Sequence, residues 1–435
     1  MIWDQHEVWP REEIEKLQLS RLKETVARAY GNVAFYREAL DRQGIKPEDI
    51  KSLADLKRLP FTTKDDLRRY YPYGMFAVPM RKIVRVHSSS GTTGLPTVVG
   101  YTRRDLDNWT DLVARIISQA GVTADDIVQI SFGYGMFTGG FGLHYGMERV
   151  GATVLPISSG NSLRQIRTMR DFGVTALVST PSYALHLAEV AEENGIDPKR
   201  DLKVRVGLFG GEGSSDWLRS EIASRWGMTP TDNYGLSEVM GPGIAGECEA
   251  ACGMHISEDH VIAEVIDPET GEQLPYGQEG ELVLTAVNKE ALPVLRFRTK
   301  DLTTLSPEPC GCGRTTMRMA RVLGRTDDMM VIRGVNVFPS QIEAALAEIP
   351  EVEPFYQLIV ETKNYLDTLT VQVEVPERYF TGSFGELEAL QKKIAGKLQT
   401  ILGLSAKIKL VEPKTLPRTA GKAQRVIDNR QVGRA

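Results

Sequence analysis

Short apolar runs rich in β-branched residues alternate with amphipathic segments through the centre of the chain. From Ile83 onward these runs end in glycine or serine loops, as in KIVRVHSSSG, DIVQISFGYG, GATVLPISSG, VTALVSTP and KVRVGLFGGEG. Helical patterns such as DLDNWTDLVARIISQ lie between them. This alternation predicts an α/β fold, in which helices cover a mostly parallel sheet and ligands bind beyond the carboxyl ends of the strands.

The pattern changes on either side of this region. Residues 11–58 place apolar positions at helical spacing among charged ones, which predicts surface helices. The runs ELVLTAV and PVLRFRTKDL predict a further, more antiparallel sheet, whereas LTVQVEV, FGELEALQKKIAGKLQTIL and AKIKLVE predict a small α+β domain. We therefore expect a large domain over residues 1–325 and a small mobile C-terminal domain over residues 326–435.

Composition agrees with two domains and limits the classes of partner. The 435 residues include 42% hydrophobic and 25% charged residues, a balance typical of a globular protein. A chain of this length is longer than a domain with a single hydrophobic core usually is. The formal net charge of -5 disfavours general binding of nucleic acid or anionic membranes. Because MIWDQHEVWP lacks the basic and apolar segments of a signal peptide, we expect a cytoplasmic protein.

Residues 88–97, SSSGTTGLPT, give the strongest local signal for ligand binding. Glycines let backbone N–H groups turn toward a ligand, and the Ser and Thr hydroxyls add donors that suit phosphate oxygens. The loop lacks the Gly-Lys-Ser/Thr ending of a Walker loop, so it contains no lysine that could reach the outer phosphates. A flexible turn without a ligand is the alternative interpretation.

Five further motifs accompany this loop: GGEG at 210–213, YGLSE at 234–238, FRTKD at 297–301, GRTDD at 324–328 and LPRTAGK at 416–422. Their order and spacing resemble the adenylate-forming superfamily of acyl-CoA synthetases, luciferases and peptide-synthetase adenylation domains. The stretches YGMFTGGFGLHYG and RTDDMMVIRGVNVFPSQIE are most similar to the phenylacetate-CoA ligase family within it. Many superfamily members end the phosphate loop in Pro-Lys, but this chain has Pro96-Thr97, as those ligases do. Which basic group screens the outer phosphates is left open.

The resemblance implies an ATP-dependent ligase for an aryl or arylacetic acid, with phenylacetate as the preferred assignment. A carboxylate is a poor electrophile, so ATP would first convert it to an acyl-AMP with release of pyrophosphate, and CoA would then displace AMP. The implied partners are the small molecules ATP, Mg²⁺, CoA and the acid, without nucleic acid or membrane, and a homodimer is left open. The alternatives are a relative with another acid or acceptor, similar to coenzyme F390 synthetases or to benzoate or indoleacetate ligases, and a zinc-stabilised binding protein without turnover.

The same resemblance assigns roles to individual residues. Lys422 would bridge the carboxylate and the α-phosphate, Glu238 would bind Mg²⁺, and Asp327 would be the hinge between the domains. The simpler alternatives are a charge in a solvated tail for Lys422, a solvated loop carboxylate for Glu238 and an ordinary surface acid for Asp327. Asp301 would hold the ribose hydroxyls. The residues expected to bind the nucleotide are Ser88, Ser89, Ser90, Gly91, Thr92, Thr93, Gly94, Gly211, Glu212, Tyr234, Gly235, Ser237, Asp301 and Arg325.

An apolar wall for the acid is expected beside the YGMFTGGFG segment. Aromatic rings and a proline there would form a flat surface that suits an aromatic substrate, although such a cluster is as often ordinary core. His144 would hydrogen-bond or gate this pocket, or serve as a structural residue. The residues assigned to the pocket are Tyr134, Phe137, Phe141, Gly210 and Pro242.

Three cysteines and one histidine in two clusters match the ligand types of a structural zinc site. Cys248, His255, Cys310 and Cys312 supply three thiolates and an imidazole, a full set for tetrahedral Zn²⁺. Cys252 is a rival ligand. The alternative is a set of reduced cysteines without metal.

Overall fold

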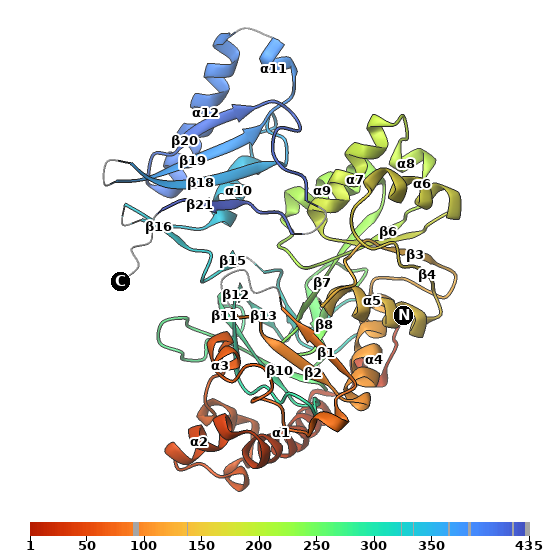
Figure 1. Cartoon of the computed structure of the whole chain (residues 1–435), viewed down its shortest axis with the longest axis vertical. Helices are drawn as coiled ribbons and strands as arrows, with labels where there is room; N and C mark the ends of the chain where they lie inside the picture. Colours follow the sequence, from red (N-terminus) through yellow and green to blue (C-terminus); the bar gives the residue numbers. More distant parts are fainter. Residues whose placement is uncertain are drawn as a thin grey trace.

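The structure is a computed structural model that describes residues 1–89, 95–136, 138–322, 324–333, 335–363, 366–381, 384–419 and 422–430. Figure 1 shows the C-terminal elements, in blue, beside a larger part that contains the rest of the chain. The N-terminal helical elements are η1 (Gln5–Val8), α1 (Arg11–Asn32), α2 (Ala34–Arg42), η2 (Pro47–Asp49), η3 (Leu53–Arg58), α3 (Lys64–Arg69) and η4 (Met80–Lys82). None of the helices in the described ranges is long and apolar enough to cross a membrane.

The largest sheet contains the predicted parallel strands together with an antiparallel extension. Strands β4, β3, β5, β6 and β7 lie side by side in this order and run parallel. Beyond β7 the sheet continues antiparallel through β8, β9, β14 and β13. The strands are β3 (Ile127–Ile130), β4 (Thr153–Leu155), β5 (Ala176–Ser179), β6 (Val206–Phe209), β7 (Thr229–Leu236), β8 (Gly241–Glu247), β9 (Met254–Ile256), β13 (Leu305–Ser306) and β14 (Arg318–Met319).

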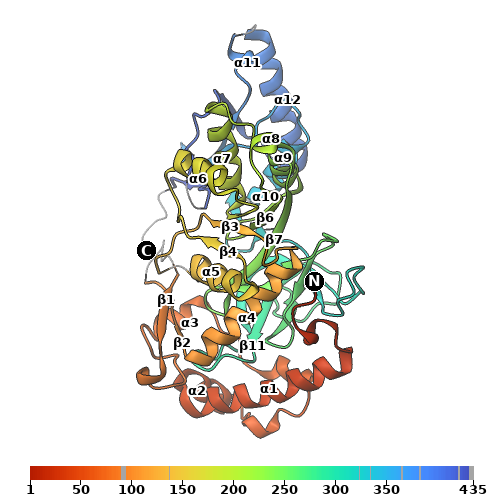
Figure 2. The same ribbon diagram turned by 90° about the vertical axis from the view of Figure 1, so that its right-hand side faces the viewer.

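Helices cover this sheet, as the alternating pattern predicts (Figure 2). Successive residues of β5 face opposite sides: Ala176 and Val178 join the large central core, whereas Leu177 joins a second core with residues of α6, α7 and α9. Helices α4 and α5 pack against β8. The helices of this region are α4 (Arg103–Gln119), α5 (Thr138–Val150), α6 (Ser162–Phe172), α7 (Pro181–Glu193), α8 (Pro198–Asp201) and α9 (Asp216–Trp226).

One predicted strand is placed differently. The KIVRVHSSSG run forms β1 (Arg85–Ser88), which pairs antiparallel with β2 (Val98–Tyr101) in a separate two-stranded sheet. The expectation that it joins the parallel sheet is therefore wrong. The connection between the two strands is short, and the Ser89 N–H donates to the Thr97 carbonyl over 3.0 Å, so β1 and β2 pair with each other.

The predicted second sheet is entirely antiparallel. Its strands are β10 (Val261–Ile266), β11 (Gly280–Ala286), β12 (Phe297–Thr303) and β15 (Gly324–Arg325), in that order. In the register of the last pair Asp301 lies opposite Arg325. Two of the predicted nucleotide-binding residues are thus neighbours across strands.

The C-terminal residues form an α+β unit with its own core, as predicted. Strands β20, β19, β18 and β21 lie side by side in this order, and residues such as Leu358, Val371 and Ile394 form the core between the sheet and its helices. The elements are β16 (Met330–Ile332), β17 (Val335–Val337), α10 (Pro339–Ala347), β18 (Tyr356–Lys363), β19 (Leu366–Glu374), α11 (Arg378–Thr381), α12 (Phe384–Leu402), β20 (Lys407–Val411) and β21 (Val426–Asp428).

Candidate active site

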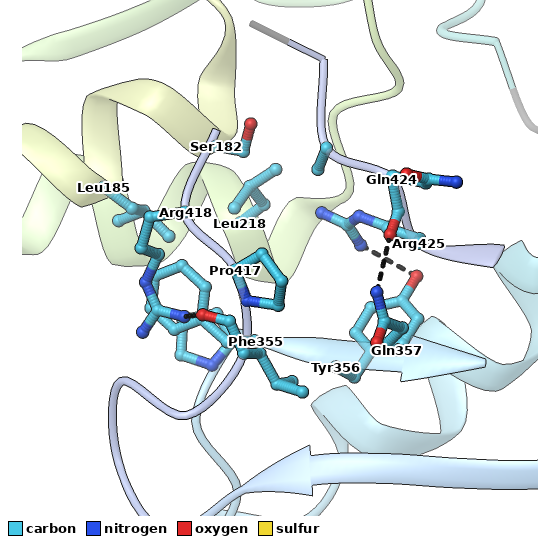
Figure 3. Close-up of a pocket in the computed structure, with 13 residues that line it drawn as sticks. Ser182, Leu185, Leu218, Phe355, Tyr356, Gln357, Pro417, Arg418, Gln424 and Arg425 are labelled. Carbon is cyan, nitrogen blue, oxygen red and sulfur yellow. Dashed lines mark hydrogen bonds between the residues drawn. The ribbon is translucent and has the colours of Figure 1, made fainter. Parts of the chain in front are cut away.

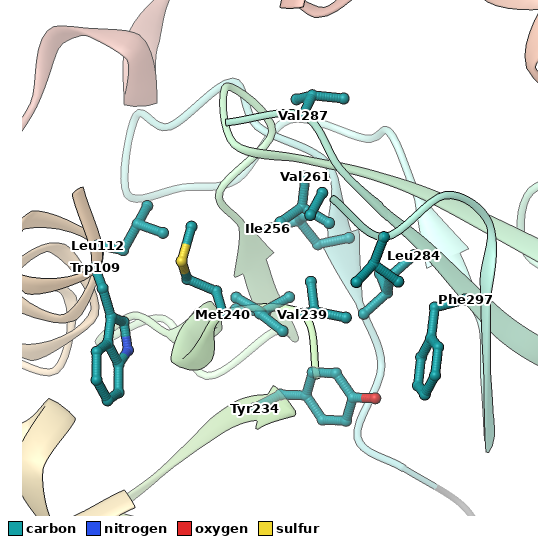
Figure 4. Packing of buried hydrophobic residues seen from close by; sticks show 14 of the residues in the cluster. Trp109, Leu112, Tyr234, Val239, Met240, Ile256, Val261, Leu284, Val287 and Phe297 are labelled. Carbon is teal, nitrogen blue, oxygen red and sulfur yellow. The ribbon is translucent and has the colours of Figure 1, made fainter. Parts of the chain in front are cut away.

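A buried carboxylate lies in the turn that follows β7. Glu238 is only 2% exposed, and the next two side chains, Val239 and Met240, are fully buried in the central core, which anchors this turn (Figure 4). The Thr97 hydroxyl donates to Glu238 Oε1 over 2.9 Å, and Lys64 Nζ lies 3.8 Å from the same oxygen. A hydroxyl and an ammonium group therefore lie beside the predicted Mg²⁺ ligand.

Sequence analysis did not identify the two lysines that approach Glu238. Lys64 begins α3, and Lys289 is fully buried, with Nζ donating to the Glu238 carbonyl over 3.4 Å. Burial lowers the pKa of Lys289 to about 8, although the carboxylates of Asp105 and Glu238 oppose this shift. No local motif marks either lysine as functional, because only the fold brings each of them to the turn after β7.

The Ser/Thr/Gly loop is linked to Glu238 through hydroxyl groups. Ser89 Oγ and Thr97 Oγ1 lie 2.5 Å apart, and Thr97 contacts Glu238 in turn. Ser88 is the last residue of β1, and its N–H donates to the Met136 carbonyl over 3.1 Å. The remaining predicted residues of this loop, Ser90, Gly91, Thr92, Thr93 and Gly94, lie outside the described residues.

A second group of predicted residues forms a chain of hydrogen bonds. The Tyr234 hydroxyl donates to Asp301 Oδ2 over 2.5 Å, and Arg325 donates to Asp301 Oδ1 over 2.6 Å. Arg325 also contacts both carboxylate oxygens of Asp327, over 2.8 and 3.0 Å. Burial raises the pKa of Asp301, while the positive charge of Arg325 opposes that shift. Asp301, the predicted ribose ligand, thus contacts Tyr234 and Arg325. Arg325 in turn contacts Asp327, the predicted hinge.

The end of β7 has little room for other side chains. A Cβ added to Gly235 would lie 2.0 Å from the carbonyl oxygen of Gly241, so only glycine fits at this position. The buried Ser237 hydroxyl lies 2.8 Å from the hydroxyl of Thr138, at the start of α5. This geometry holds the YGLSE segment close against α5 and β8.

Lys422 reaches this region from the C-terminal unit. A Cβ added to Gly211, which has a positive φ of 85°, would lie 3.8 Å from Lys422 Cε. Desolvation lowers the pKa of Lys422 from its ordinary value, and the positive charges of Lys64 and Arg325 act in the same direction. Glu212 accepts a hydrogen bond from the Ala423 N–H over 2.9 Å. The structure therefore brings the predicted catalytic lysine to the GGEG loop.

The predicted pocket residues are partly brought together. The rings of Tyr134 and Phe141 meet edge to face with centroids 5.3 Å apart, and the Tyr134 hydroxyl lies 3.2 Å from His144 Nδ1. A Cβ added to Gly142 would lie 2.8 Å from Pro242 Cγ, so α5 packs closely on β8. Gly142, the residue after Phe141, thus lies against Pro242.

Gly210, another predicted pocket residue, lies against β7. Gly210 follows β6, and a Cβ there would lie 2.8 Å from the carbonyl oxygen of Asn233. Phe137 lies outside the described residues.

The Cys and His side chains of the predicted metal site converge between β9 and the segment after β13. One ligand atom from each of Cys248, His255, Cys310 and Cys312 lies within 4.8 Å of every other. Cys312 Sγ is 3.4 Å from His255 Nε2, and His255 Nδ1 is 3.1 Å from the Thr316 hydroxyl. Burial lowers the pKa of His255 to about 4, so its imidazole is neutral at physiological pH and free to bind a metal.

The rival cysteine also lies in this group. Cys252 is exposed, and its Sγ lies 3.3 Å from Cys310 Sγ, whereas the Sγ atoms of Cys248 and Cys310 are 3.7 Å apart. Zinc with tetrahedral bonds of about 2.3 Å would place two sulfur ligands roughly 3.8 Å apart. The spacing of Cys248 and Cys310 fits that geometry.

Comparison with known proteins identifies the family. The family model "AMP-binding enzyme" matches residues 39–288, and "AMP-binding enzyme C-terminal domain" matches residues 334–430. Phenylacetate-coenzyme A ligase of Aromatoleum evansii is 50% identical over 423 residues, which is 97% of this chain and 95% of that protein. The ligase of the same name from Escherichia coli strain K12 is 46% identical over 422 residues, with coverage of 97% and 96%.

This chain is also similar to a CoA ligase of known structure. The 2-hydroxyisobutyryl-CoA ligase in its postadenylation state is 31% identical, with a TM-score of 0.91 and coverage of 98% of this chain and 91% of that one. The same enzyme in its thioesterification state, with coverage of 98% and 92%, superposes with a TM-score of 0.72 at 32% identity. The chain belongs to the AMP-binding enzymes and, among them, to the phenylacetate-coenzyme A ligase family.

Proposed function

We propose that this chain is an ATP-dependent ligase that converts phenylacetate, or a close arylacetic acid, to its CoA thioester. The observation that carries the proposal is that Lys422 lies within electrostatic reach of Asp301 and of Lys64, and that Lys64 Nζ lies 3.8 Å from Glu238, in a chain of this family. A carboxylate oxygen of the acid attacks the α-phosphorus of ATP, and the bond to pyrophosphate breaks. The CoA sulfur then attacks the acyl carbon, AMP leaves, and the thiol proton passes to solvent.

The residues near Glu238 would neutralise negative charge on the phosphates of ATP. The carboxylate and the hydroxyl of Thr97 are hard oxygen donors that suit Mg²⁺, whose remaining ligands would be phosphate oxygens and water. Bound Mg²⁺ would withdraw charge from the phosphates. Lys64, 3.8 Å from Glu238, supplies the positive charge that Thr97 cannot, and we assign it to the outer phosphates. Ser237 would contact the α-phosphate.

The nucleoside is assigned to the contacts around Asp301. Its carboxylate would accept hydrogen bonds from the ribose hydroxyls, and Arg325 would orient it and approach the phosphates. Tyr234 would pack against the adenine, with its hydroxyl held by Asp301. The Ser/Thr/Gly loop from Ser88 to Gly94 would surround the phosphates.

We assign the observed arrangement to the adenylating conformation. Lys422 lies at the GGEG loop, and the TM-score of 0.91 with a postadenylation-state structure exceeds the 0.72 with a thioesterification-state structure. The central core ends at Met319 and the C-terminal core begins at Met330, which supports a domain boundary after residue 325. Asp327, in the turn between β15 and β16, would then act as the hinge.

The aromatic wall leads to a prediction about the acid. Phenylacetate is expected to give a kcat/KM at least about tenfold higher than acetate, octanoate or 2-hydroxyisobutyrate, because the aromatic rings of Tyr134 and Phe141, to which we assign the acid, would pack best against another aromatic ring. Initial rates of pyrophosphate release across these four acids test the assignment. Equal or faster turnover of octanoate would contradict an aryl pocket, and preference for 2-hydroxyisobutyrate would move the chain toward the specificity of its structural neighbour.

We also propose that the cysteine and histidine cluster holds one structural Zn²⁺. The donor set is complete, and the Thr316 hydroxyl beside His255 Nδ1 would orient the ring, as second groups do in zinc sites. Because the ligands come from two segments that are distant in the sequence, Zn²⁺ would crosslink them.

Purified protein is therefore expected to contain about one zinc per chain, as measured by elemental analysis. Cys310→Ser should lose the zinc and lower Tm by several degrees, because the metal stabilises the fold. Cys252→Ser is the matched control and should retain it. Protein prepared without chelator that contains no zinc would contradict the site. Loss of zinc in Cys252→Ser with retention in Cys248→Ser would show that Cys252, and not Cys248, is the ligand.

A further inference from the structure

On the N-terminal side of Lys422, an arginine attaches the chain to helix α7. Arg418 donates to both carboxylate oxygens of Glu189, over 3.0 Å each. It also contacts both oxygens of Glu374 in the C-terminal unit, over 2.9 and 2.7 Å, and its guanidinium lies 3.4 Å from the centroid of the Phe355 ring. Arg418 thus joins the two parts of the chain four residues before the lysine.

On the other side of Lys422, a single carboxylate bridges the two parts. Glu212 Oε2 accepts the Ala423 N–H over 2.9 Å, and Glu212 Oε1 accepts the Ser182 N–H over 2.7 Å. Ser182 lies in the first turn of α7, where backbone N–H groups have no partner within the helix. Glu212 therefore connects the first turn of α7 to the residue that directly follows the lysine.

This arrangement requires a carboxylate. Both oxygens of Glu212 face N–H donors, and an ionised carboxylate offers acceptors only. An amide in its place would turn one of the two acceptors into an N–H₂ donor that faces another N–H. The partial positive charge at the start of α7 further favours the negative side chain.

The interface also contains apolar contacts: Trp217 packs against the C-terminal core, and Phe355 packs against the core beneath α7 and α9. Figure 3 shows Ser182, Leu185 and Leu218 of the large part facing Pro417 and Arg418 of the terminal segment, and a cavity lies between them. Alongside this packing, Arg418 contacts α7 directly, and Glu212 links Ala423 to the first turn of α7.

We propose that Glu212 is a positioning residue that holds Lys422 in place for adenylation by bridging Ser182 and Ala423. The inference rests on the proposed function and differs from the expectation that Glu212 binds the nucleotide. Both carboxylate oxygens serve the protein itself, and the bond to Ala423 breaks when the C-terminal unit rotates away. Glu212 therefore favours the first half-reaction and has no part in the second.

The test separates the two half-reactions in Glu212→Gln. Single-turnover formation of phenylacetyl-AMP is expected to fall at least about tenfold, which corresponds to about 1.4 kcal/mol. Conversion of synthetic phenylacetyl-AMP and CoA to thioester should stay within roughly twofold of wild type, as should the KM for ATP. Glu212→Asp, which keeps the charge but shortens the side chain, should show a smaller loss in the same direction.

Glu193→Gln is the matched control. Glu193 lies at the other end of α7 and pairs with Lys414 across the same two parts, but both side chains are largely exposed, so its loss should change neither half-reaction. Equal loss of both half-reactions in Glu212→Gln, with Tm preserved, would overturn the proposal. A tenfold rise in the KM for ATP would overturn it in favour of nucleotide binding. If wild-type protein forms no adenylate, the proposed function itself fails, and that result precedes any variant.

Discussion

Lys422→Ala is expected to lower the rate of acyl-AMP formation by roughly three orders of magnitude. Negative charge builds between the attacking carboxylate and the α-phosphate, and a fixed ammonium group stabilises it more in the transition state than in the ground state. Alanine supplies no charge at this position. Thioester formation from synthetic acyl-AMP and CoA should persist, because in the proposed mechanism the C-terminal unit moves before the second half-reaction.

Rapid-quench measurement of each half-reaction separates these outcomes. Lys409→Ala, which removes an exposed lysine of β20 in the same unit, is the control and should leave both rates unchanged. Parallel loss of both half-reactions in a folded Lys422→Ala protein would show that one static arrangement performs both steps. Retention of adenylation would remove Lys422 from the reaction altogether.

Glu238→Gln is expected to lower kcat for adenylation by about a hundredfold and to raise the Mg²⁺ concentration needed for half-maximal rate. Glutamine keeps the size of the side chain and can still accept the hydrogen bond from Thr97. It loses the charge that a hard cation prefers, and it leaves Lys64 and Lys289 without that counter-charge. Initial rates across a Mg²⁺ series at saturating ATP measure both effects.

A second buried glutamate provides the control for folding. Glu264 is paired with Arg296 over 3.0 Å and has no assigned role in Mg²⁺ binding, so Glu264→Gln should lower Tm without changing the Mg²⁺ dependence. An unchanged Mg²⁺ dependence in Glu238→Gln would contradict its assignment as the metal ligand.

The sequence predicted element types better than strand partners. Runs such as VTALVSTP are buried parallel strands, as their apolar pattern indicates. Residues 85–88 belong to a similar apolar run but pair antiparallel with β2. An apolar run does not specify which strand it pairs with, and a short connection favours antiparallel pairing. Strand pairing depends on contacts that no local pattern contains.

The candidate site shows the same division. Motif order indicated Glu238, Asp301 and Lys422, and the donor types of Cys248 and His255 indicated a metal cluster. Lys64 and Lys289 carry no such signal, since each is an ordinary lysine until the fold places it near the Glu238 turn. The bridging role proposed for Glu212 likewise depends on distances between three separate segments, which only the structure provides.

The most direct test of the central claim is to mix the protein with ATP, Mg²⁺ and phenylacetate and analyse the products before and after CoA is added. We expect phenylacetyl-AMP and pyrophosphate in equal amounts, at about one per active site, before CoA is present. Added CoA should then convert the adenylate to phenylacetyl-CoA and AMP. Absence of the adenylate, or release of ADP and phosphate in place of AMP and pyrophosphate, would contradict the account.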